Sequence, residues 1–404
     1  MMFKIAYHIT INFIAFSLPF FGIFSSKIKN FLIARSNSNS PTHGKVKFWI
    51  HCSSLGEYEM AIPVLNELSK SHSLEDFVIT FFSPSGYEQV KNGPHASRIM
   101  YLPLDTSKNV RQFYKKYNPQ KALFIRYDFW YNFIQYGQKN DTKFYLINGR
   151  FQSEHFIFGL FGQPYLKLIR KFENLFTSDK ISSELLKKIN ERTHFVGDTR
   201  YDRVAEILKT DKDYPEIKDF KANRKLLIIG SSWEREEALT KKLLDTVPEN
   251  LAIIIAPHDI KRTDQILEVF KSYSPKRYTH GDFNNKTSVL VLDTIGMLSE
   301  LYRYADFSLV GGGFHGALHN VIEPAVWGNH ISFGPQYQKF PEAHDAIEHG
   351  FGFAITHEDH WIHMINDLIQ NQQKLFEVKE KSKKFVTDQQ QATRVITGYI
   401  LTKN

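Results

Sequence analysis

The sequence predicts an α/β protein of two Rossmann-like domains that face each other across a ligand cleft, preceded by a membrane-associated helix. Short apolar runs alternate with loops and helical patterns at the spacing of βαβ units, which indicates parallel sheets. The alternation stops in a charged stretch at 209–224 and restarts at residue 225. The length of 404 residues suits two domains, and 42% hydrophobic residues are ordinary for a folded protein.

Composition narrows the class of protein further. It excludes a disordered chain, a collagen, a disulfide scaffold and a multi-span membrane protein, because only one long apolar stretch exists. The net charge of +8 suits an anionic partner such as nucleic acid, anionic lipid or a phosphorylated substrate. The basic residues are scattered and no recognition helix is evident, so we predict no nucleic-acid partner. Cys52 is the single cysteine and cannot form an internal disulfide.

Residues 1–36 are predicted to be a membrane anchor segment. Residues 5–24 lack a formal charge and are about long enough to span hydrocarbon. Lys4 precedes this stretch and Lys27, Lys29 and Arg35 follow it, which is the reverse of a signal peptide and predicts a cytoplasmic body. A spanning helix and a helix lying in the interface both remain open. The third alternative is a buried first helix of the globular domain.

The remaining chain divides into domains by its strand pattern. We expect an N-terminal Rossmann-like domain at 45–205, a linker at 206–224, a C-terminal Rossmann-like domain at 225–385 and a C-terminal helix at 386–404. The predicted strands of the first domain lie at 46–52, 77–83, 99–104, 121–127, 144–149 and 175–179. Those of the second domain lie at 225–233, 251–258, 288–294, 307–313 and 330–335.

Glu57 is the first candidate catalytic residue. It ends the segment SSLGE, which follows a buried strand and opens a predicted helix. A carboxylate in that first helical turn projects toward the cleft and can act as a general base. The alternative is a carboxylate that only complements the helix dipole.

A glycine-rich turn at 311–316 is the candidate phosphate site. It follows a strand, and the segment beginning at His319 is predicted to start the next helix, so backbone N–H groups and the helix dipole would meet a phosphate. Asn320 and Glu323 would share one face of that helix, and Glu323 could bind ribose hydroxyls. The alternative is a tight turn with a capping Asn320. No P-loop motif is present.

Other candidates end neighbouring strands. The segment 230–232, which contains Ser231, and the pair Pro257 and His258 would line the phosphate side, although His258 alone fits a structural histidine equally well. Arg126 would lie on the same side of its strand as Asp128, and Arg200 adds a second cation. These cations could meet an anionic sugar or phosphate, or they could form a surface ion pair.

No metal or cofactor is predicted. The histidine-rich segment at 357–363 lacks the spacing of a zinc helix, and no Cys/His zinc pattern occurs.

Eight motifs occur in the order found in one enzyme family. They are WIHCSSLGEYEMAIPVL, PLDTSKNVRQF, FWYNF, LINGRFQ, VGDTRYD, GSSWEREE, LVLDTIGMLSELY and VGGGFHGALHNVIEPAVWGNHISFGPQYQKF. The chain thereby resembles the 3-deoxy-D-manno-octulosonic acid (Kdo) transferases, membrane-associated inverting glycosyltransferases with the GT-B fold that act in lipid A assembly. The resemblance extends from the N-terminal apolar segment to about residue 355.

The resemblance implies roles for individual residues. Glu57 matches the general base, while Arg126 and Arg200 stand where the family has acidic and lysine residues that serve the reaction. The family's Pro-Arg-His segment aligns with 256–258 and its Met-Gly-Glu turn with 295–297. The implied donor-binding residues are Ser231, Pro257, His258, Ile295, Gly296, Met297, Gly312, Gly313, Asn320 and Glu323.

The implied function is transfer of Kdo from CMP-Kdo to the lipid A precursor (lipid IVA) in lipopolysaccharide biosynthesis. A glutamate base and no metal would serve this reaction, at the cytoplasmic face of the cell inner membrane. One alternative is a GT-B enzyme that uses another nucleotide sugar. The other is a non-catalytic, membrane-tethered nucleotide-binding module.

Overall fold

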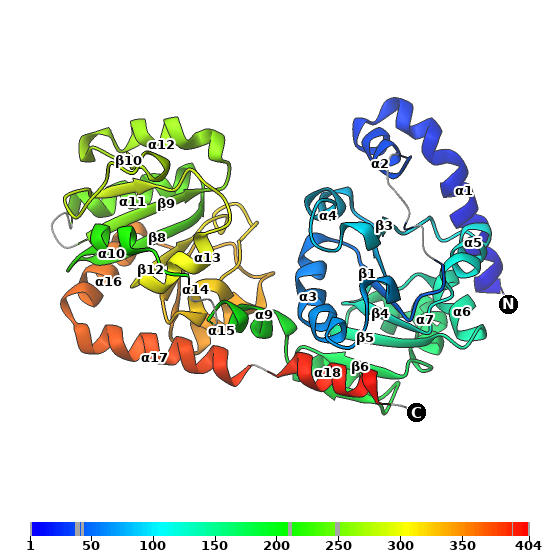
Figure 1. The fold of residues 1–404 in the computed structure, drawn as a ribbon. Coiled ribbons are helices and arrows are strands. Elements are labelled where there is room, and N and C mark those ends of the chain that lie inside the picture. The colour runs from blue at the N-terminus through cyan, green and yellow to red at the C-terminus, as the bar shows by residue number, and fades with distance from the viewer. Residues whose placement is uncertain are drawn as a thin grey trace. The chain divides into compact units, whose positions relative to one another are not determined.

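Two units, each built around a parallel sheet, make up the chain (Figure 1). The computed structural model describes residues 2–36, 41, 44–208, 212–246, 251–389 and 391–402. Unit 1 comprises Met1–Arg203 and Gln391–Asn404, and unit 2 comprises Val204–Gln390. Each unit holds a seven-stranded sheet, and the prediction of two parallel-sheet α/β domains is therefore confirmed.

The sheet of unit 1 has the order β3-β2-β1-β4-β5-β6-β7, and all its strand pairs are parallel. Each strand is short and followed by a crossover. The strand order reverses at β1, which pairs with both β2 and β4. The strands are β1 (Phe48–Cys52), β2 (Phe77–Phe81), β3 (Ile99–Tyr101), β4 (Lys121–Ile125), β5 (Lys143–Gly149), β6 (Asn174–Thr177) and β7 (Thr193–Phe195).

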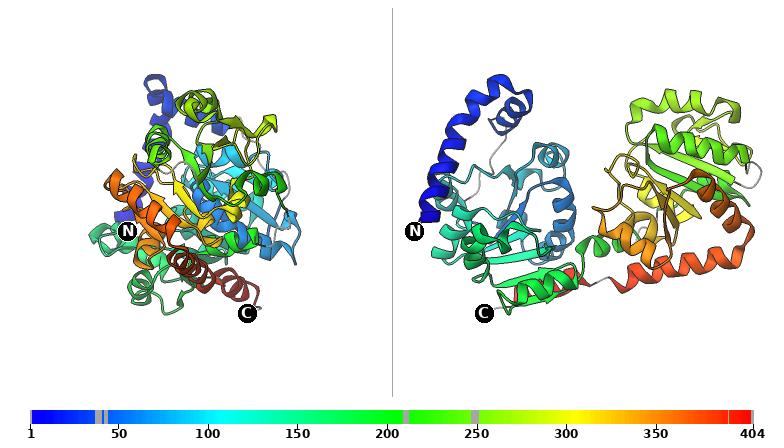
Figure 2. Two further views of the ribbon diagram at one scale, coloured as in Figure 1. Left: turned by 90° about the vertical axis from the view of Figure 1, so that its left-hand side faces the viewer. Right: turned by 180° about the vertical axis from the view of Figure 1, so that it is seen from behind.

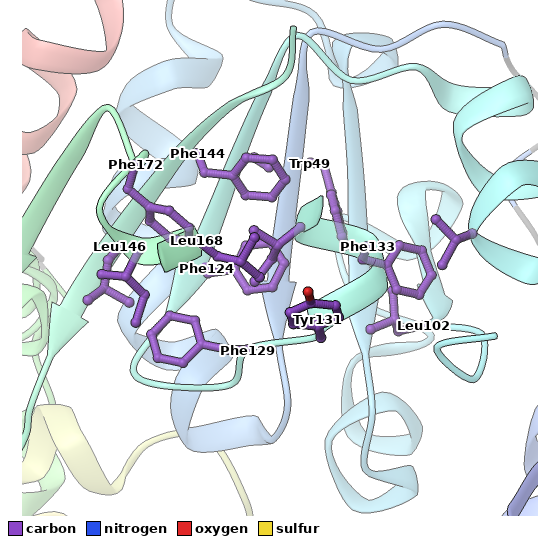
Figure 3. Packing of buried hydrophobic residues seen from close by; sticks show 14 of the residues in the cluster. Trp49, Leu102, Phe124, Phe129, Tyr131, Phe133, Phe144, Leu146, Leu168 and Phe172 are labelled. Carbon is purple, nitrogen blue, oxygen red and sulfur yellow. The ribbon is translucent and has the colours of Figure 1, made fainter. Parts of the chain in front are cut away.

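Both faces of this sheet are covered by helices, which explains why its strands are apolar throughout rather than alternating. Trp49 of β1 packs into one hydrophobic cluster, whereas Phe48 and Ile50 pack into the cluster on the other face. Figure 3 shows the first cluster, in which Trp49 lies among phenylalanine side chains that include Phe124 and Phe144. The covering helices are α3 (Leu55–Ser69), α4 (Pro84–Val90), α5 (Ser107–Tyr117), α6 (Tyr131–Lys139), α7 (Gln163–Ile169), α8 (Lys180–Lys187), α9 (Thr199–Ile207) and α18 (Ala392–Leu401).

Helix α18 returns from unit 2 and packs on unit 1 beside α3. Ile396 and Ile400 of α18 enter the second cluster of unit 1. The carboxylate of Asp202 accepts hydrogen bonds from the backbone N–H groups of Gln391 (2.6 Å) and Thr393 (2.7 Å) at the start of this helix. The C-terminal helix therefore belongs to the N-terminal unit.

The sheet of unit 2 has the order β10-β11-β9-β8-β12-β13-β14 and is also parallel. Its order reverses at β8, which pairs with both β9 and β12. The strands are β8 (Lys225–Ser232), β9 (Leu251–Pro257), β10 (Lys276–Arg277), β11 (Val289–Val291), β12 (Phe307–Val310), β13 (His330–Phe333) and β14 (Gly352–Ala354). The helices are α10 (Pro215–Lys221), α11 (Glu234–Thr246), α12 (Thr263–Val269), α13 (Leu298–Leu301), α14 (Ile322–Val326), α15 (Pro341–Glu348), α16 (Glu358–Gln370) and α17 (Gln372–Asp388).

The segment predicted as a linker at 206–224 contains folded structure. Helix α10 begins with Pro215, and its residues Ile217 and Phe220 are fully buried in a hydrophobic cluster of unit 2. Two apolar residues in a strongly charged segment give little periodicity, although they suffice to bury one face of a short helix. Residues 209–211 of the predicted linker lie outside the described part of the chain.

The N-terminal segment forms two helices, α1 (Met2–Phe24) and α2 (Ser26–Ser36). Helix α1 is long and apolar enough to cross a membrane by length and composition. Only Ile11 and Gly22 of α1 are buried, which contradicts the alternative of a buried first helix. Figure 2 shows α1 and α2 in dark blue at the edge of unit 1.

Candidate functional site

The predicted site residues gather at equivalent positions of the two sheets. In open parallel sheets, ligands bind beyond the carboxyl ends of the strands where the strand order reverses. In unit 1 that position lies between β1 and β4, which lead into Glu57 and into Arg126. In unit 2 it lies between β8 and β12, which lead into Trp233 and the glycine turn at 311–316.

Glu57 lies in the first turn of α3, directly after β1. Its carboxylate accepts a hydrogen bond from the backbone N–H of Ser53. Burial, together with the negative charge of Asp128, raises the pKa of Glu57 to about 7, against the opposing effects of His51, the Ser53 N–H and Arg126. A carboxyl group whose pKa lies near neutrality is well suited to general base catalysis.

Asp128 follows β4 and lies next to the same turn. It accepts hydrogen bonds from His51 Nε2 (2.8 Å), Trp130 Nε1 (3.0 Å) and the hydroxyl of Ser53. Burial acts to raise the pKa of Asp128, but the hydrogen bond and charge of His51 and the bonds from Ser53 and Trp130 outweigh it and lower the pKa. The two neighbouring carboxyl groups therefore have pKa values displaced in opposite directions, a pattern typical of assigned acid–base roles.

His51 connects Asp128 to the interior of the sheet. Its ring is fully buried, and Nδ1 lies 2.8 Å from the hydroxyl of Thr80 on β2. Thr80 accepts a hydrogen bond from Trp49 Nε1 (2.8 Å), which can only donate. The hydroxyl of Thr80 is then free to donate to His51 Nδ1, while His51 Nε2 lies 2.8 Å from Asp128 and 3.0 Å from Trp130 Nε1.

Arg126 and Arg200, the two predicted cations, are both close to the buried carboxylate of Asp198. Arg200 forms an ion pair with Asp198 (Nη2 to Oδ2, 2.9 Å), and the amide of Asn148 donates to the same carboxylate at 2.9 Å. Burial acts to raise the pKa of Asp198, but the charges of Arg200 and Arg126 lower it. Arg126 also lowers the pKa of Glu57. Arg200 is thus held in an ion pair. The alternative for this residue is a surface ion pair, but the observed pair is buried.

In unit 2, the glycine turn brings backbone segments into contact. Gly312 has φ +85°, and a Cβ added there would lie 2.2 Å from the carbonyl oxygen of Ala317. A Cβ on Gly313 would lie 2.5 Å from the backbone nitrogen of Gly334. The N–H of Gly312 donates to the buried carboxylate of Glu236 at 2.9 Å. Glycine is therefore required here by backbone geometry, independent of any ligand.

The helix predicted to follow this turn begins later and is shorter than expected. Helix α14 starts at Ile322 and has five residues. The backbone N–H groups of His315 and His319 bond to the carbonyl oxygens of Gly312 and Gly311. The expectation of a helix N-terminus directly at the glycine turn is therefore wrong, because the intervening chain folds back on the turn instead.

Asn320 and Glu323 do lie together. The side-chain carbonyl of Asn320 accepts from the N–H of Ile322 (2.9 Å), and its amide donates to Glu323 Oε1 (3.1 Å). The first of these bonds is local, but Asn320 is not the N-cap predicted by the alternative, because the N-cap of α14 is Val321 and has no side-chain cap bond. The second orients the carboxylate of Glu323.

An aromatic and imidazole stack stands beside the glycine turn. The exposed ring of His258, which follows Pro257 at the end of β9, stacks on Trp233 with centroids 4.4 Å apart and lies 4.8 Å from the ring of His319. Ser231 has φ +55° at the end of β8. The hydroxyl of its neighbour Ser232 is buried and donates to Glu237, so this hydroxyl does not face a ligand.

The turn at 295–297 is only partly accessible to a ligand. Ile295 is 84% exposed, and Gly296 has φ +95°. The side chain of Met297 is 6% exposed and packs in a hydrophobic cluster of unit 2. A ligand at this turn would meet Ile295 and the backbone of Gly296 rather than the methionine side chain.

Sequence comparison finds related glycosyltransferases. Residues 27–203 match the family described as 3-deoxy-D-manno-octulosonic-acid transferase (kdotransferase). A 3-deoxy-D-manno-octulosonic acid transferase of Aquifex aeolicus is 22% identical over 374 residues, which cover 84% of this chain and 90% of that protein. One from Chlamydophila psittaci is 24% identical over 304 residues, 72% of this chain and 70% of that protein. Residues 27–203 therefore match the Kdo transferase family, and the chain as a whole is similar to Kdo transferases.

A further relative is a longer, bifunctional protein. A bifunctional glycosyltransferase/methyltransferase of Fusobacterium nucleatum is 24% identical over 371 residues, which cover 86% of this chain and 56% of that protein. This chain therefore matches about half the length of that relative.

Solved structures support the fold of the transferase. A UDP-N-acetylglucosamine 2-epimerase superposes with a TM-score of 0.57 at 12% identity, covering 89% of this chain and 98% of the epimerase. The UDP-GlcNAc 2-epimerase of Neisseria meningitidis gives a TM-score of 0.54 at 14% identity, covering 89% of this chain and all of that chain. At such identities the likeness concerns the fold alone. It confirms the expected GT-B type of paired α/β domains.

Several residues of the candidate site give little signal in the sequence. His51 and Thr80 lie inside apolar strands, and Trp233 and Glu236 lie at the start of a charged helix. For His51 a signal does exist, because Trp49 and His51 share one face of β1 and a buried imidazole needs a polar partner. Among the described residues, no three His, Cys, Asp or Glu side chains are grouped as ligands for a metal ion.

Proposed function

We propose that this transferase moves Kdo from CMP-Kdo to the lipid A precursor (lipid IVA) with inversion at the anomeric carbon. The observation that carries the proposal is the pair of neighbouring carboxyl groups in unit 1, of which Glu57 has a raised pKa and Asp128 a lowered one. The similarity to Kdo transferases supports the sugar and the class of reaction.

In this mechanism Glu57 acts as the general base. Its carboxylate accepts the proton of an acceptor sugar hydroxyl while that oxygen attacks the anomeric carbon of Kdo. The bond from the anomeric carbon to the phosphate oxygen breaks, and CMP leaves with the bonding electron pair. A single displacement needs only one carboxylate and inverts the anomeric centre.

Asp128 and His51 act as positioning residues for this base. Asp128 stays ionised because three donors point at it, and its negative charge helps to raise the pKa of Glu57. Ser53 joins the two carboxylates, since its N–H donates to Glu57 and its hydroxyl donates to Asp128. A carboxylate supported in this way keeps the orientation that proton transfer needs.

The donor is assigned to unit 2. The stack of Trp233 and His258 offers an aromatic face to a cytosine ring or an imidazole to a phosphate. The carboxylate of Glu323, oriented by Asn320, is suited to accept hydrogen bonds from ribose hydroxyls. Gly312 and Gly313 permit the close approach of the backbone.

The acceptor is an anionic lipid, and the apolar N-terminal helices bring the transferase to the membrane that contains it. We place the protein at the cytoplasmic face of the inner membrane. The net charge of +8 favours binding to an anionic surface.

Mass spectrometry of the lipid product tests the proposal. Purified transferase with CMP-Kdo and lipid IVA should release CMP and form a lipid heavier by one or more Kdo units. The same incubation with UDP-sugars should leave the lipid unchanged. A sugar added only from a UDP donor would contradict the proposed donor, and absence of turnover with every donor would favour a binding module.

A further inference from the structure

Both ends of the N-terminal helix pair are attached to the body of unit 1. Helix α1 contacts the body through its first two turns, and α2 contacts it through its last two turns. The helices also pack against each other near Gly22, where an added Cβ would lie 3.2 Å from the Leu32 side chain. This arrangement bears on whether α1 can cross a bilayer.

The first contact is polar and aromatic. The ring of Phe3 lies 5.2 Å from that of Tyr131 and 5.8 Å from that of Tyr165. The hydroxyl of Tyr7 donates to Asp105 Oδ2 at 2.7 Å, and His8 Nδ1 lies 2.9 Å from the hydroxyl of Ser107. The N-terminal end of α1 is therefore held on the surface of unit 1.

The partner of Tyr7 is itself fixed in the core. Asp105 is fully buried and accepts the backbone N–H groups of Asn132 (2.9 Å) and Phe133 (3.0 Å) at the start of α6. Burial raises the pKa of Asp105 to about 7, against these hydrogen bonds. A buried carboxyl group loses a bond if Tyr7 leaves, so detaching α1 carries a free-energy cost.

The second contact lies in α2. The ring of Phe31 lies 5.6 Å from that of Phe82, and the guanidinium of Arg35 lies 4.8 Å from the Phe82 ring and 4.7 Å from the Tyr101 ring. Cation–π contacts of this kind hold the end of α2 against the body.

Between the two contacts, α1 exposes apolar side chains. Phe13, Phe16, Phe20, Phe21, Ile23 and Phe24 are each between 49% and 85% exposed. Two polar side chains of this part bond to the helix itself, since Asn12 donates to the carbonyl of His8 (2.7 Å) and Ser17 to that of Ile14 (3.2 Å). Internally bonded polar groups lower the cost of entering hydrocarbon.

A second exposed apolar segment lies near the N-terminal end of α1. Leu160 and Phe161 are 93% and 86% exposed. Their loop is linked to α1 through Phe156, whose ring lies 5.4 Å from that of Tyr165, which in turn contacts Phe3. A second exposed apolar segment thus lies on unit 1 near the attached end of α1.

The charges of the segment complement an anionic surface. Helices α1 and α2 contain no Asp or Glu, and Lys27 and Lys29 are exposed just beyond Phe24. Juxtamembrane lysines bind anionic headgroups.

We propose that α1 does not cross the membrane, and that α1, α2 and the loop at Leu160 and Phe161 enter one leaflet from the side of the body. Residues 9–24, the part beyond the first contact, are about 24 Å long at 1.5 Å per residue, shorter than a hydrocarbon core of about 30 Å. A spanning α1 would place Tyr7 on the side opposite Asp105 and break their hydrogen bond. The occupant of this surface is therefore the acyl region of a single phospholipid leaflet with anionic headgroups.

Sidedness of labelling tests this topology, which refines the membrane contact in the proposed function without depending on turnover. Lys4→Cys and Lys108→Cys place single reactive thiols on exposed positions of α1 and of the body. Wild-type chain is the blank, because Cys52 is fully buried. Spheroplasts and inverted inner-membrane vesicles are treated with a membrane-impermeant maleimide, and detergent-solubilised samples define full labelling.

Both cysteines should react with the maleimide in one preparation, either spheroplasts or inverted vesicles, and neither should react in the other. Reaction of Lys4→Cys and Lys108→Cys in opposite preparations would overturn the proposal, as would protection of Lys4→Cys in both. Complete release of wild-type chain by alkaline carbonate would also overturn it, because the helices would then not enter hydrocarbon.

A matched pair of substitutions tests the role of the loop. Replacing Leu160 and Phe161 with serine should lower the fraction bound to vesicles of phosphatidylethanolamine and phosphatidylglycerol several-fold at low protein concentration. Phe376→Ser, which removes an exposed phenylalanine from unit 2, should leave that fraction unchanged. Equal binding by all three proteins would remove the loop from the proposed surface.

Discussion

Both sheets are seven-stranded and parallel, and each reverses its order at its first strand, but they end in different chemistry. The edge of unit 1 between β1 and β4 carries titratable side chains, with Glu57 and Asp128 joined by Ser53. The edge of unit 2 between β8 and β12 carries backbone turns and rings, with Gly312 beside Trp233 and His258. A similar scaffold thus presents paired carboxyl groups in one unit and a glycine turn with aromatic rings in the other.

The buried polar groups of the two units have different roles. In unit 1, polar groups enter the sheet itself through His51 and Thr80. Burial raises the pKa of Glu57, whereas hydrogen bonds and the charge of His51 lower that of Asp128. In unit 2, the buried carboxylate of Glu236 is used to hold the Gly312 amide, so it supports the turn rather than the chemistry. Substitutions in the two edges should therefore fail in different ways.

The largest effect is expected from Glu57→Gln. Loss of the general base should lower kcat about 100- to 10,000-fold, while the amide preserves the shape of the side chain. The matched control is Glu67→Gln, the same change at an exposed site near the other end of α3, where kcat should stay within twofold. Normal turnover by purified Glu57→Gln would remove the base assignment.

A smaller effect, confined to unit 2, is expected from Gly312→Ala. The new Cβ meets the Ala317 carbonyl at φ +85°, so we expect lower stability and weaker CMP binding by calorimetry. Gly281→Ala is the control, because Gly281 has φ +69° with nothing within 4 Å of its Cβ, and strain alone costs about 1–2 kcal/mol. If both variants bound CMP like wild type, the glycine turn would have no part in the donor site.

The smallest effect is expected from His258→Ala. An aromatic stack is worth about 0.5–1.5 kcal/mol, so removing the imidazole should weaken CMP binding about 2- to 10-fold and leave the acceptor KM unchanged. His280→Ala, at an exposed histidine of the same unit, should bind CMP normally. An unchanged affinity for CMP in His258→Ala would assign the stack a structural role only.

Local sequence patterns predicted much of the fold and part of this site. Alternating strands and helices indicated both sheets, and the SSLGE segment placed Glu57 correctly after a strand because the turn is local. The partners of Glu57 are non-local. His51, Thr80 and Asp128 belong to three chain segments that only strand pairing brings together.

Two predictions about short elements failed. The glycine turn lacked the expected helix because residues after Gly312 bond back to it, and such a bond leaves no periodic signal. Helix α10 was assigned to a linker because Ile217 and Phe220 are its only fully buried residues among charged neighbours. Both cases show that tertiary contacts decide short elements.

The pH dependence of transfer tests the central claim, that the ionisation of Glu57 governs the reaction. A base must be deprotonated to act, so kcat/KM for wild type should fall as the pH drops through an acid limb at about 7. Asp128→Asn removes a charge that raises this pKa and should move the limb to lower pH, whereas Arg126→Gln removes a charge that lowers it and should move the limb to higher pH. A wild-type limb near the ordinary glutamate value, or shifts of the same sign in both variants, would contradict the account.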